Sequence, residues 1–239
     1  MENLYGILIG VGIICCFLVL WYFEKKDKLD HKFMDFIMFN GMAAIVIGFI
    51  SSAVFQGIYN YIENPQMGFS LTGGITFLGG LIGGVISFLV GYLIFRKKYT
   101  TKLIDVLYII PSAILVAHGF GRVGCFFAKC CYGIETDSWL GVMVHGKKVL
   151  PTNLFEAIFL FIMFGITFLI ARKKKTPQLF TLYVLSYGVW RFFIEFYRGD
   201  HRGSFVEGLS PSQFWSLLMI ILSVPMFFMI NFLTRKANK

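Results

Sequence analysis

Long runs of apolar residues follow one another along the chain and are separated by short polar segments. A helix needs about 20 mostly apolar residues to cross the hydrocarbon core of a bilayer. About seven runs approach or exceed that length, and they cover residues 4–23, 34–60, 71–95, 103–120, 153–171, 178–196 and 212–233. The pattern predicts an all-α membrane protein with about seven transmembrane helices.

The composition agrees with lipid as the solvent of this chain. Of its 239 residues, 57% are hydrophobic and only 15% are charged, whereas a soluble domain has roughly 25% charged residues. The seven runs leave almost nothing for a separate soluble domain. We therefore expect residues 1–239 to form a single integral-membrane domain.

The net charge of +9 is explained by topology and does not indicate nucleic-acid binding. Basic clusters follow the first, third, fifth and seventh runs, so all four lie on one side of the membrane. The positive-inside rule makes that side cytoplasmic. We expect a multi-pass protein of the cytoplasmic membrane, with its N-terminus outside and its C-terminus in the cytoplasm. The clusters are Lys25–Lys28, Arg96–Lys98, Arg172–Lys175 and Arg235–Lys239.

The first run is interpreted as a membrane span and not as a cleaved signal peptide, because Met1-Glu2-Asn3 has no basic residue. With that orientation, the two longest outward segments are residues 121–152 and 197–211. Binding and catalytic residues concentrate in such connections. The active face is therefore expected to point outward.

Glycine is concentrated in the stretch Gly73–Gly84, at the start of the third run. One interpretation is close packing of helices through small residues. The other is a broken helix start beside a cavity, where irregular backbone is tolerated at membrane depth. The spacing alone favours the first interpretation without excluding the second.

The sixth run carries four polar residues on one helical face: Tyr187, Arg191, Glu195 and Arg198. They are spaced at i, i+4, i+8 and i+11, which repeats the period of an α-helix. Ionisable residues within a membrane segment usually face a polar cavity or a partner and mark a functional site. The alternative is a structural Arg191–Glu195 ion pair with Arg198 reaching to the interface.

A second candidate segment ends the fourth run, from His118 to Gly124. Gly121 and Gly124 allow backbone or ligand to approach closely. Arg122 is suited to binding a pair of phosphate oxygens, and with arginines of the sixth run it would form a cationic pocket for an anionic phospholipid. His118 precedes Arg122 by one helical turn and is a candidate base. The alternative is three separate interfacial arginines.

Three cysteines follow these glycines: Cys125, Cys130 and Cys131. A disulfide from Cys125 to either of the others, or a reactive thiolate beside Arg122, is compatible with an outward position. Zinc binding together with His118 or His145 is possible in principle, but the spacing is not that of a known finger or ribbon. We therefore expect no metal and no cofactor. The remaining pair, Cys15 and Cys16, is interpreted as small buried apolar residues.

Several short motifs occur along the chain in a definite order, and together they cover nearly its full length. They resemble those of the bacterial prolipoprotein diacylglyceryl transferases. The motifs are Tyr5-Gly6, Gly73–Gly83, Gly121-Arg122-Val123-Gly124, Pro151–Glu156, the block from Tyr187-Gly188 through Arg191 and Glu195 to Arg198, and Ser210-Pro211-Ser212-Gln213.

The resemblance implies transfer of a diacylglyceryl group from phosphatidylglycerol to the thiol of a lipobox cysteine in a prolipoprotein. The product is a thioether, and glycerol phosphate leaves. The expected partners are phosphatidylglycerol or another anionic phospholipid, a prolipoprotein and the membrane, without nucleic acid. The catalytic candidates are Arg122, Tyr187, Arg191, His118, Cys125 and Cys130. The substrate-binding candidates are Tyr5, Gly79, Gly80, Gly121, Gly124, Glu195 and Arg198.

The chain departs from the family pattern at four places, one of which is an arginine of the family's second-helix region that has no clear match near Ser51-Ser52. Leu78 stands where the family has histidine, Cys125 where its signature has asparagine, and Cys130 where it has glutamate. These differences favour a divergent relative with another acceptor or a cysteine-dependent mechanism. Two alternative functions stay open at this point: a thiol-based membrane redox protein, and a non-catalytic phospholipid-binding or transport protein on the same fold.

Overall fold

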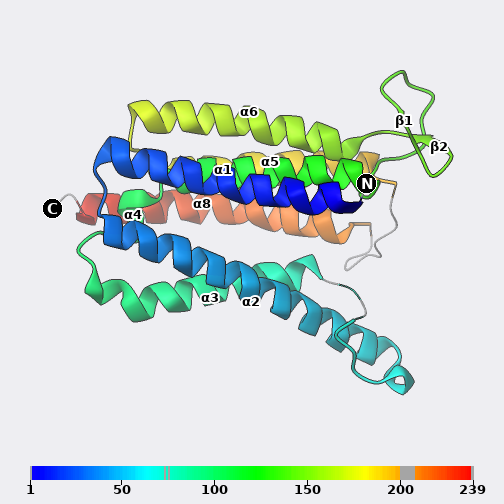
Figure 1. Ribbon diagram of the computed structural model, residues 1–239, viewed down its shortest axis with the longest axis horizontal. Coiled ribbons are helices and arrows are strands. Elements are labelled where there is room, and N and C mark those ends of the chain that lie inside the picture. Colours follow the sequence, from blue (N-terminus) through cyan, green and yellow to red (C-terminus); the bar gives the residue numbers. More distant parts are fainter. Residues whose placement is uncertain (1, 73, 75, 200–207, 238–239) are drawn as a thin grey trace. The chain divides into compact units, whose positions relative to one another are not determined.

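The computed structural model describes residues 2–72, 74, 76–199 and 208–237 (Figure 1). The chain divides into two compact units. The first unit is formed by residues 1–23 and 103–239, and the second unit by residues 24–102.

Within the described residues, seven helices are long and apolar enough to cross a membrane. The prediction of an all-α membrane fold with seven spans is therefore confirmed. The spanning helices are α1 (Glu2–Asp27), α2 (His31–Glu63), α3 (Phe77–Phe95), α5 (Ile110–Phe127), α6 (Thr152–Lys173), α7 (Leu179–Ile194) and α8 (Pro211–Ala237). The short elements between them are η1 (Pro65–Met67), η2 (Arg96–Lys98), α4 (Leu103–Val106), β1 (Val142–Val144), β2 (Lys147–Val149) and η3 (Glu195–Tyr197).

The fourth span lies further along the chain than the apolar pattern indicates. Residues 103–106 form the separate helix α4, and α5 starts near Pro111, a residue that favours the first turn of a helix. Helix α5 then continues to Phe127. Residues 121–127, which the apolar pattern places in an outward segment, are therefore helical. The glycines there do not end the helix, because backbone at membrane depth needs its internal hydrogen bonds.

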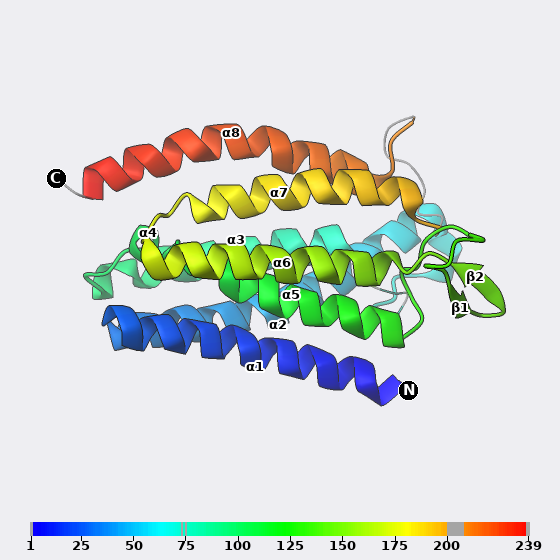
Figure 2. The ribbon, with the colours of Figure 1, turned by 90° about the horizontal axis from the view of Figure 1, so that it is seen from above.

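In the first unit, α5 packs on α6 and α7 packs on α8, as both views show (Figures 1 and 2). Leu115, Leu160, Met163 and Tyr187 form a buried cluster between α5, α6 and α7. A Cβ atom added at Gly12 would lie 2.9 Å from the carbonyl oxygen of Ala117, so α1 and α5 approach closely at that point. Small residues thus let the helix backbones come together.

The outer surface of α6 is apolar along its length. Ile158, Ile162, Ile166 and Leu169 recur at helical spacing and are between 42% and 57% exposed. A continuous apolar stripe of this kind is not stable against water but is well solvated by lipid acyl chains. The exposed face of α6 therefore agrees with its role as a membrane span.

The segment between α5 and α6 contains a small antiparallel hairpin, in which Val142 pairs with Val149. Both turn residues, His145 and Gly146, have positive φ angles, as a type I′ turn requires. An isolated bridge from Glu135 to Val149 joins the hairpin to the residues that precede it. The apolar pattern does not predict this hairpin. Of the other predicted outward segment, 197–211, residues 200–207 fall outside the described part of the chain.

The second unit consists mainly of α2 and α3, which pack on each other. A Cβ atom at Gly79 would lie 2.5 Å from Cβ of Phe55, and one at Gly80 would lie 3.4 Å from the carbonyl oxygen of Gly48. The Ser52 hydroxyl donates to the carbonyl oxygen of Thr76 over 2.7 Å, which holds the residue before α3 against α2. Helix α3 consequently begins at residue 77 and not at 71, and its glycines serve close helix packing.

Candidate active site

Three helices of the first unit meet at the buried carboxylate of Glu156, which is 1% exposed. Oε2 of Glu156 lies 3.1 Å from Nε of Arg122 on α5. The hydroxyl of Tyr187 on α7 donates to Oε1 of Glu156 over 2.8 Å. An ionised carboxylate in an apolar interior is costly unless it is paired and hydrogen-bonded. Arg122 and Tyr187 together meet that requirement.

His118 belongs to the same group. Its Nε2 lies 4.0 Å from Oε1 of Glu156, and its ring packs edge-on against the ring of Tyr187 with 5.1 Å between centroids. His118 and Arg122 are one turn apart on α5, so both side chains face Glu156. His118 and Tyr187 therefore both belong to the group of side chains around this carboxylate.

A second buried ion pair lies further along α7. Nη2 of Arg191 lies 2.8 Å from Oε2 of Glu195 and donates to the Ser212 hydroxyl at the start of α8 over 2.9 Å. The Ser210 hydroxyl donates to the other Glu195 oxygen over 2.9 Å. The predicted pairing of Arg191 with Glu195 is therefore present, and α8 supplies hydroxyls that complete it.

The guanidinium groups of Arg122 and Arg191, from α5 and α7, converge on one place. Both interact electrostatically with the Glu156 carboxylate and with Tyr187. Nη1 of Arg191 is buried and has no hydrogen-bond partner among the described residues. A buried cationic donor left without a partner is well placed to bind an incoming anion. Arg191 thus offers a free N–H beside the Arg122–Glu156 pair.

Three thiols lie directly beyond this cluster. Cys125 is one turn after Arg122 on α5, and Cys130 and Cys131 follow the end of that helix. The three Sγ atoms lie within 4.8 Å of one another, and none of the five cysteines, all of which are described, forms a disulfide. Of the alternatives left open for these cysteines, the disulfide from Cys125 is therefore not the one formed in this structure.

The two loop thiols differ in their acidity. The pKa of Cys131 is lowered, because the Cys125 thiol hydrogen-bonds to it and because the cations of Arg198 and Arg122 stabilise the thiolate. The pKa of Cys130 is raised by burial and by the charge of Cys131. One thiolate is thus favoured among the three sulfurs, and it is held next to arginine.

Tyr5 of α1 also reaches the thiol end of α5. A Cβ atom at Gly124 would lie only 3.0 Å from Cδ2 of Tyr5, so the absence of a side chain at Gly124 makes room for the tyrosine ring. Gly121 differs, because a Cβ atom there would meet nothing within 4 Å. Packing against Tyr5 therefore explains why a residue without a side chain is needed at Gly124. Packing gives no such reason at Gly121.

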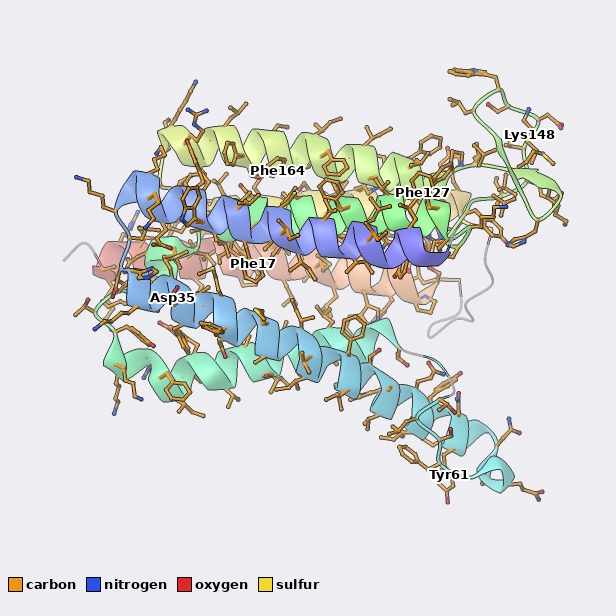
Figure 3. The ribbon with its side chains drawn as sticks, in the orientation of Figure 1. Phe17, Asp35, Tyr61, Phe127, Lys148 and Phe164 are labelled. Atoms are coloured by element: carbon orange, nitrogen blue, oxygen red, sulfur yellow. The ribbon has the colours of Figure 1, made fainter. Side chains whose placement is uncertain are left out.

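All of these groups lie at one end of the first unit, where α5 ends and the hairpin begins. Phe127 and Lys148 mark this end in Figure 3. The structure brings His118, Arg122, Tyr187, Arg191 and Glu195 together, and it places the three thiols, Tyr5 and Arg198 beside them. The other substrate-binding candidates, Gly79 and Gly80, belong to the second unit, as does Leu78.

The residue that sequence reasoning did not select is Glu156. It is the only charged residue in the apolar run 153–171, and an isolated carboxylate in a membrane segment is a strong functional signal. Ser210, Ser212 and Gln213 were also not selected, although Ser210 and Ser212 bind the second ion pair and the Gln213 side chain accepts from the Ser210 backbone N–H over 3.0 Å. A single serine next to a membrane span does not by itself indicate a functional site, as a carboxylate within the span does.

A bundle of membrane-spanning helices with arginine–carboxylate pairs and thiols gathered at one end defines a class: multi-pass membrane proteins with a buried, arginine- and thiol-rich site. The comparison with known families is more specific. The model of the prolipoprotein diacylglyceryl transferase family matches residues 3–229. The chain belongs to this family, which confirms the resemblance seen in its motifs and identifies it as a transferase.

Similar proteins cover nearly the whole chain. A phosphatidylglycerol–prolipoprotein diacylglyceryl transferase of Clostridium tetani is 36% identical over 93% of this chain and 91% of its own length. The enzyme numbered 2 of that name in Clostridium perfringens is 31% identical over 91% of this chain and 86% of its own length. One from Dehalococcoides mccartyi is 32% identical over 98% of this chain and 92% of its own length. This family membership favours the transferase over the redox and non-catalytic alternatives.

Proposed function

We propose that this protein transfers a diacylglyceryl group from phosphatidylglycerol to a cysteine thiol of a prolipoprotein. Membership of the family and the names of the relatives support this reaction. The structural observation that carries the proposal is the convergence of Arg122 and Arg191 beside Glu156 and Tyr187. Two guanidinium groups in a place of low dielectric are suited to a phosphodiester headgroup.

In the proposed reaction the thiolate of the acceptor attacks the glyceryl carbon that carries the phosphate. A carbon–sulfur bond forms, the carbon–oxygen bond breaks, and glycerol phosphate leaves with the electron pair. Negative charge then grows on the leaving phosphate. Arg122 and the unpartnered Nη1 of Arg191 stabilise that charge in the transition state, which is where electrostatic stabilisation accelerates a reaction.

His118 is the proposed acceptor of the thiol proton. Its Nε2 lies 4.0 Å from the Glu156 carboxylate, which would stabilise the imidazolium that forms. Tyr187 is the proposed positioning residue, because its hydroxyl donates to the same carboxylate. Glu156 thereby orients one arginine, one histidine and one tyrosine from two other helices.

The site is proposed to face the outside of the cytoplasmic membrane, with a lipobox cysteine as the acceptor. Within the first unit, α6 ends with Arg172 and Lys173 and α8 ends with Arg235 and Lys236. Both basic ends lie opposite the hairpin (Figure 2). By the positive-inside rule, these basic ends support a cytoplasmic location for this side of the unit, and hence an outer location for the hairpin and the site.

Transfer from labelled phosphatidylglycerol to a lipobox peptide in proteoliposomes tests the function. We expect Arg122→Ala and Arg191→Ala each to lower the rate about a hundredfold or more, as removal of a charge-stabilising donor does. Lys173→Ala, at the other end of α6, is the matched control and should retain full activity. Release of glycerol phosphate and the mass of the peptide are measured together. Full activity in both arginine variants would contradict the proposal.

A further inference from the structure

The cluster of Cys125, Cys130 and Cys131 has the dimensions of a metal site. Their Sγ atoms lie within 4.8 Å of one another. Zinc binds thiolate at about 2.3 Å, so two sulfurs of a tetrahedral site are about 3.8 Å apart. The separations between the three sulfurs therefore exceed that spacing by at most about 1 Å.

The backbone around the cluster is fixed from several sides, so the site is formed before any ion arrives. The N–H of Cys130 donates to the carbonyl oxygen of Cys125 over 3.1 Å. At the start of α6, the Asn153 amide donates to the carbonyl oxygen of Cys130 over 2.9 Å, and the Thr152 hydroxyl donates to that of Cys131 over 3.1 Å. A rigid surrounding structure of this kind is what holds metal ligands in place.

The charges around the cluster suit three thiolates and a divalent ion. Zn²⁺ with three thiolates carries one net negative charge. The guanidinium groups of Arg198 and Arg122 interact with Cys131 and offset that charge. Among the residues that the structure describes, the ligand atoms that lie close enough together to share one metal ion here are the three cysteine sulfurs, without a histidine or a carboxylate. Three protein ligands leave one coordination position for substrate, which is the pattern of catalytic zinc sites.

We propose that Cys125, Cys130 and Cys131 bind a zinc ion whose fourth position takes the thiol of the acceptor cysteine. This inference rests on the proposed function and names the group that activates its nucleophile. A thiol bound to Zn²⁺ is deprotonated outright, so it attacks as a thiolate. The position is suitable, because Cys125 follows Arg122 by one turn of α5 and Arg122 is the proposed phosphate ligand.

The step balances in atoms and charge. The S–H bond of the acceptor breaks as its sulfur binds zinc, and the proton passes to His118. The sulfur then forms a bond to the glyceryl carbon while the bond from that carbon to the phosphate oxygen breaks. The phosphate oxygen keeps the electron pair and takes the proton from His118. The thioether sulfur, a weaker ligand than thiolate, leaves the ion free for another acceptor.

Metal content tests the site without reference to activity. The full chain is purified in detergent with a reductant, incubated with Zn²⁺ and dialysed, and zinc is measured by mass spectrometry. We expect about one zinc per chain and a sulfur-to-metal charge-transfer band when Co²⁺ replaces it. Replacing all three site cysteines by serine should abolish both. The matched control, Cys15→Ser with Cys16→Ser on α1, should retain both, and circular dichroism checks that each variant is folded.

Two results would overturn the site: zinc binding by the wild-type chain no greater than that of the triple serine variant, or a mass two hydrogens lower under reductant, which would show that the thiols form a disulfide. The role of the ion is tested by chelation. We expect transfer by the wild-type chain to fall at least tenfold in chelator and to return with added zinc.

The zinc site and the transfer function can each be contradicted separately. Transfer that proceeds at full rate in metal-free protein would overturn the zinc-activated thiol and leave the proposed function standing. Stoichiometric zinc with no transfer to any thiol peptide would overturn the proposed function while the metal site itself remained.

Discussion

At the residue scale the central group is Glu156, a single carboxylate that serves three partners. Its two oxygens receive Arg122 and Tyr187, and His118 lies near the same carboxylate. A buried charge in this position stabilises the fold only as long as its counter-charge is present. It also fixes the direction in which the arginine and histidine point, so we expect stability and activity to depend on the same group.

Replacing Glu156 by glutamine tests that double role. The side chain keeps its size but loses its charge, and Arg122 is left as a largely buried cation without this counter-ion. We expect the free energy of unfolding to fall by about 3 kcal/mol and transfer to fall with it. Tyr187→Phe, which removes one hydrogen bond, is the comparison and should cost about 1 kcal/mol. Thermal unfolding in detergent measures both variants. Equal destabilisation by the two would argue against Glu156 as the hub.

At the scale of elements, the decisive feature is the length of α5. The helix continues through three glycines to Phe127 and therefore carries His118, Arg122 and Cys125 along one face. If the helix ended at residue 120, as the apolar pattern indicates, Arg122 would lie in a flexible loop. The rigid helix instead presents the proposed phosphate ligand and the first thiol in a constant relation to each other.

Two glycines of α5 give an internal comparison. A Cβ atom at Gly124 would lie 3.0 Å from the Tyr5 ring, whereas Gly121 has open space. We expect Gly124→Ala to destabilise the α1–α5 contact by about 1–3 kcal/mol, the usual cost of overpacking. Gly121→Ala should leave unfolding unchanged or slightly stabilise the helix. Thermal unfolding reports the packing of each variant.

Transfer measurements on the same two variants address the open space at Gly121. If lipid occupies that space, as the substrate-binding prediction requires, Gly121→Ala lowers transfer although the fold is intact. Unchanged transfer in that variant would remove Gly121 from the substrate-binding residues. Unchanged stability of Gly124→Ala would contradict the packing interpretation of Gly124.

At the scale of the whole molecule, the distribution of charge agrees with one orientation in the membrane. The basic residues that end α6 and α8 lie at the opposite end of the first unit from the hairpin and the thiols (Figure 1). Such a separation gives the protein a preferred topology. In the proposed topology, the site lies on the side on which exported prolipoproteins would be met.

Tagging experiments test this orientation. An epitope inserted between Asp137 and Ser138 should be cleaved by protease added to spheroplasts, because the hairpin segment faces outward in the proposed topology. An epitope at the C-terminus should be protected until the membrane is opened. The reverse pattern would place the site in the cytoplasm and would contradict an acceptor presented from outside.

The sequence by itself determined the membrane class, the number of spans and the family. These depend on the length of apolar runs and on local motifs such as the block from Tyr187 to Arg198, and both can be read along the chain. The i, i+4 pairing of Arg191 with Glu195 was predictable for the same reason, because a helix relates residues at fixed spacing.

Only the tertiary structure decided which distant residues meet. Glu156 joins the site because α6 packs between α5 and α7, and no local pattern contains that relation. The three sulfurs converge because α5 runs to its full length and the chain then turns back at Lys129 and Cys131, both with positive φ angles. Non-glycine residues rarely adopt that conformation, and here hydrogen bonds from α6 maintain it. The centre of the site therefore depends on contacts between helices that are distant in the sequence.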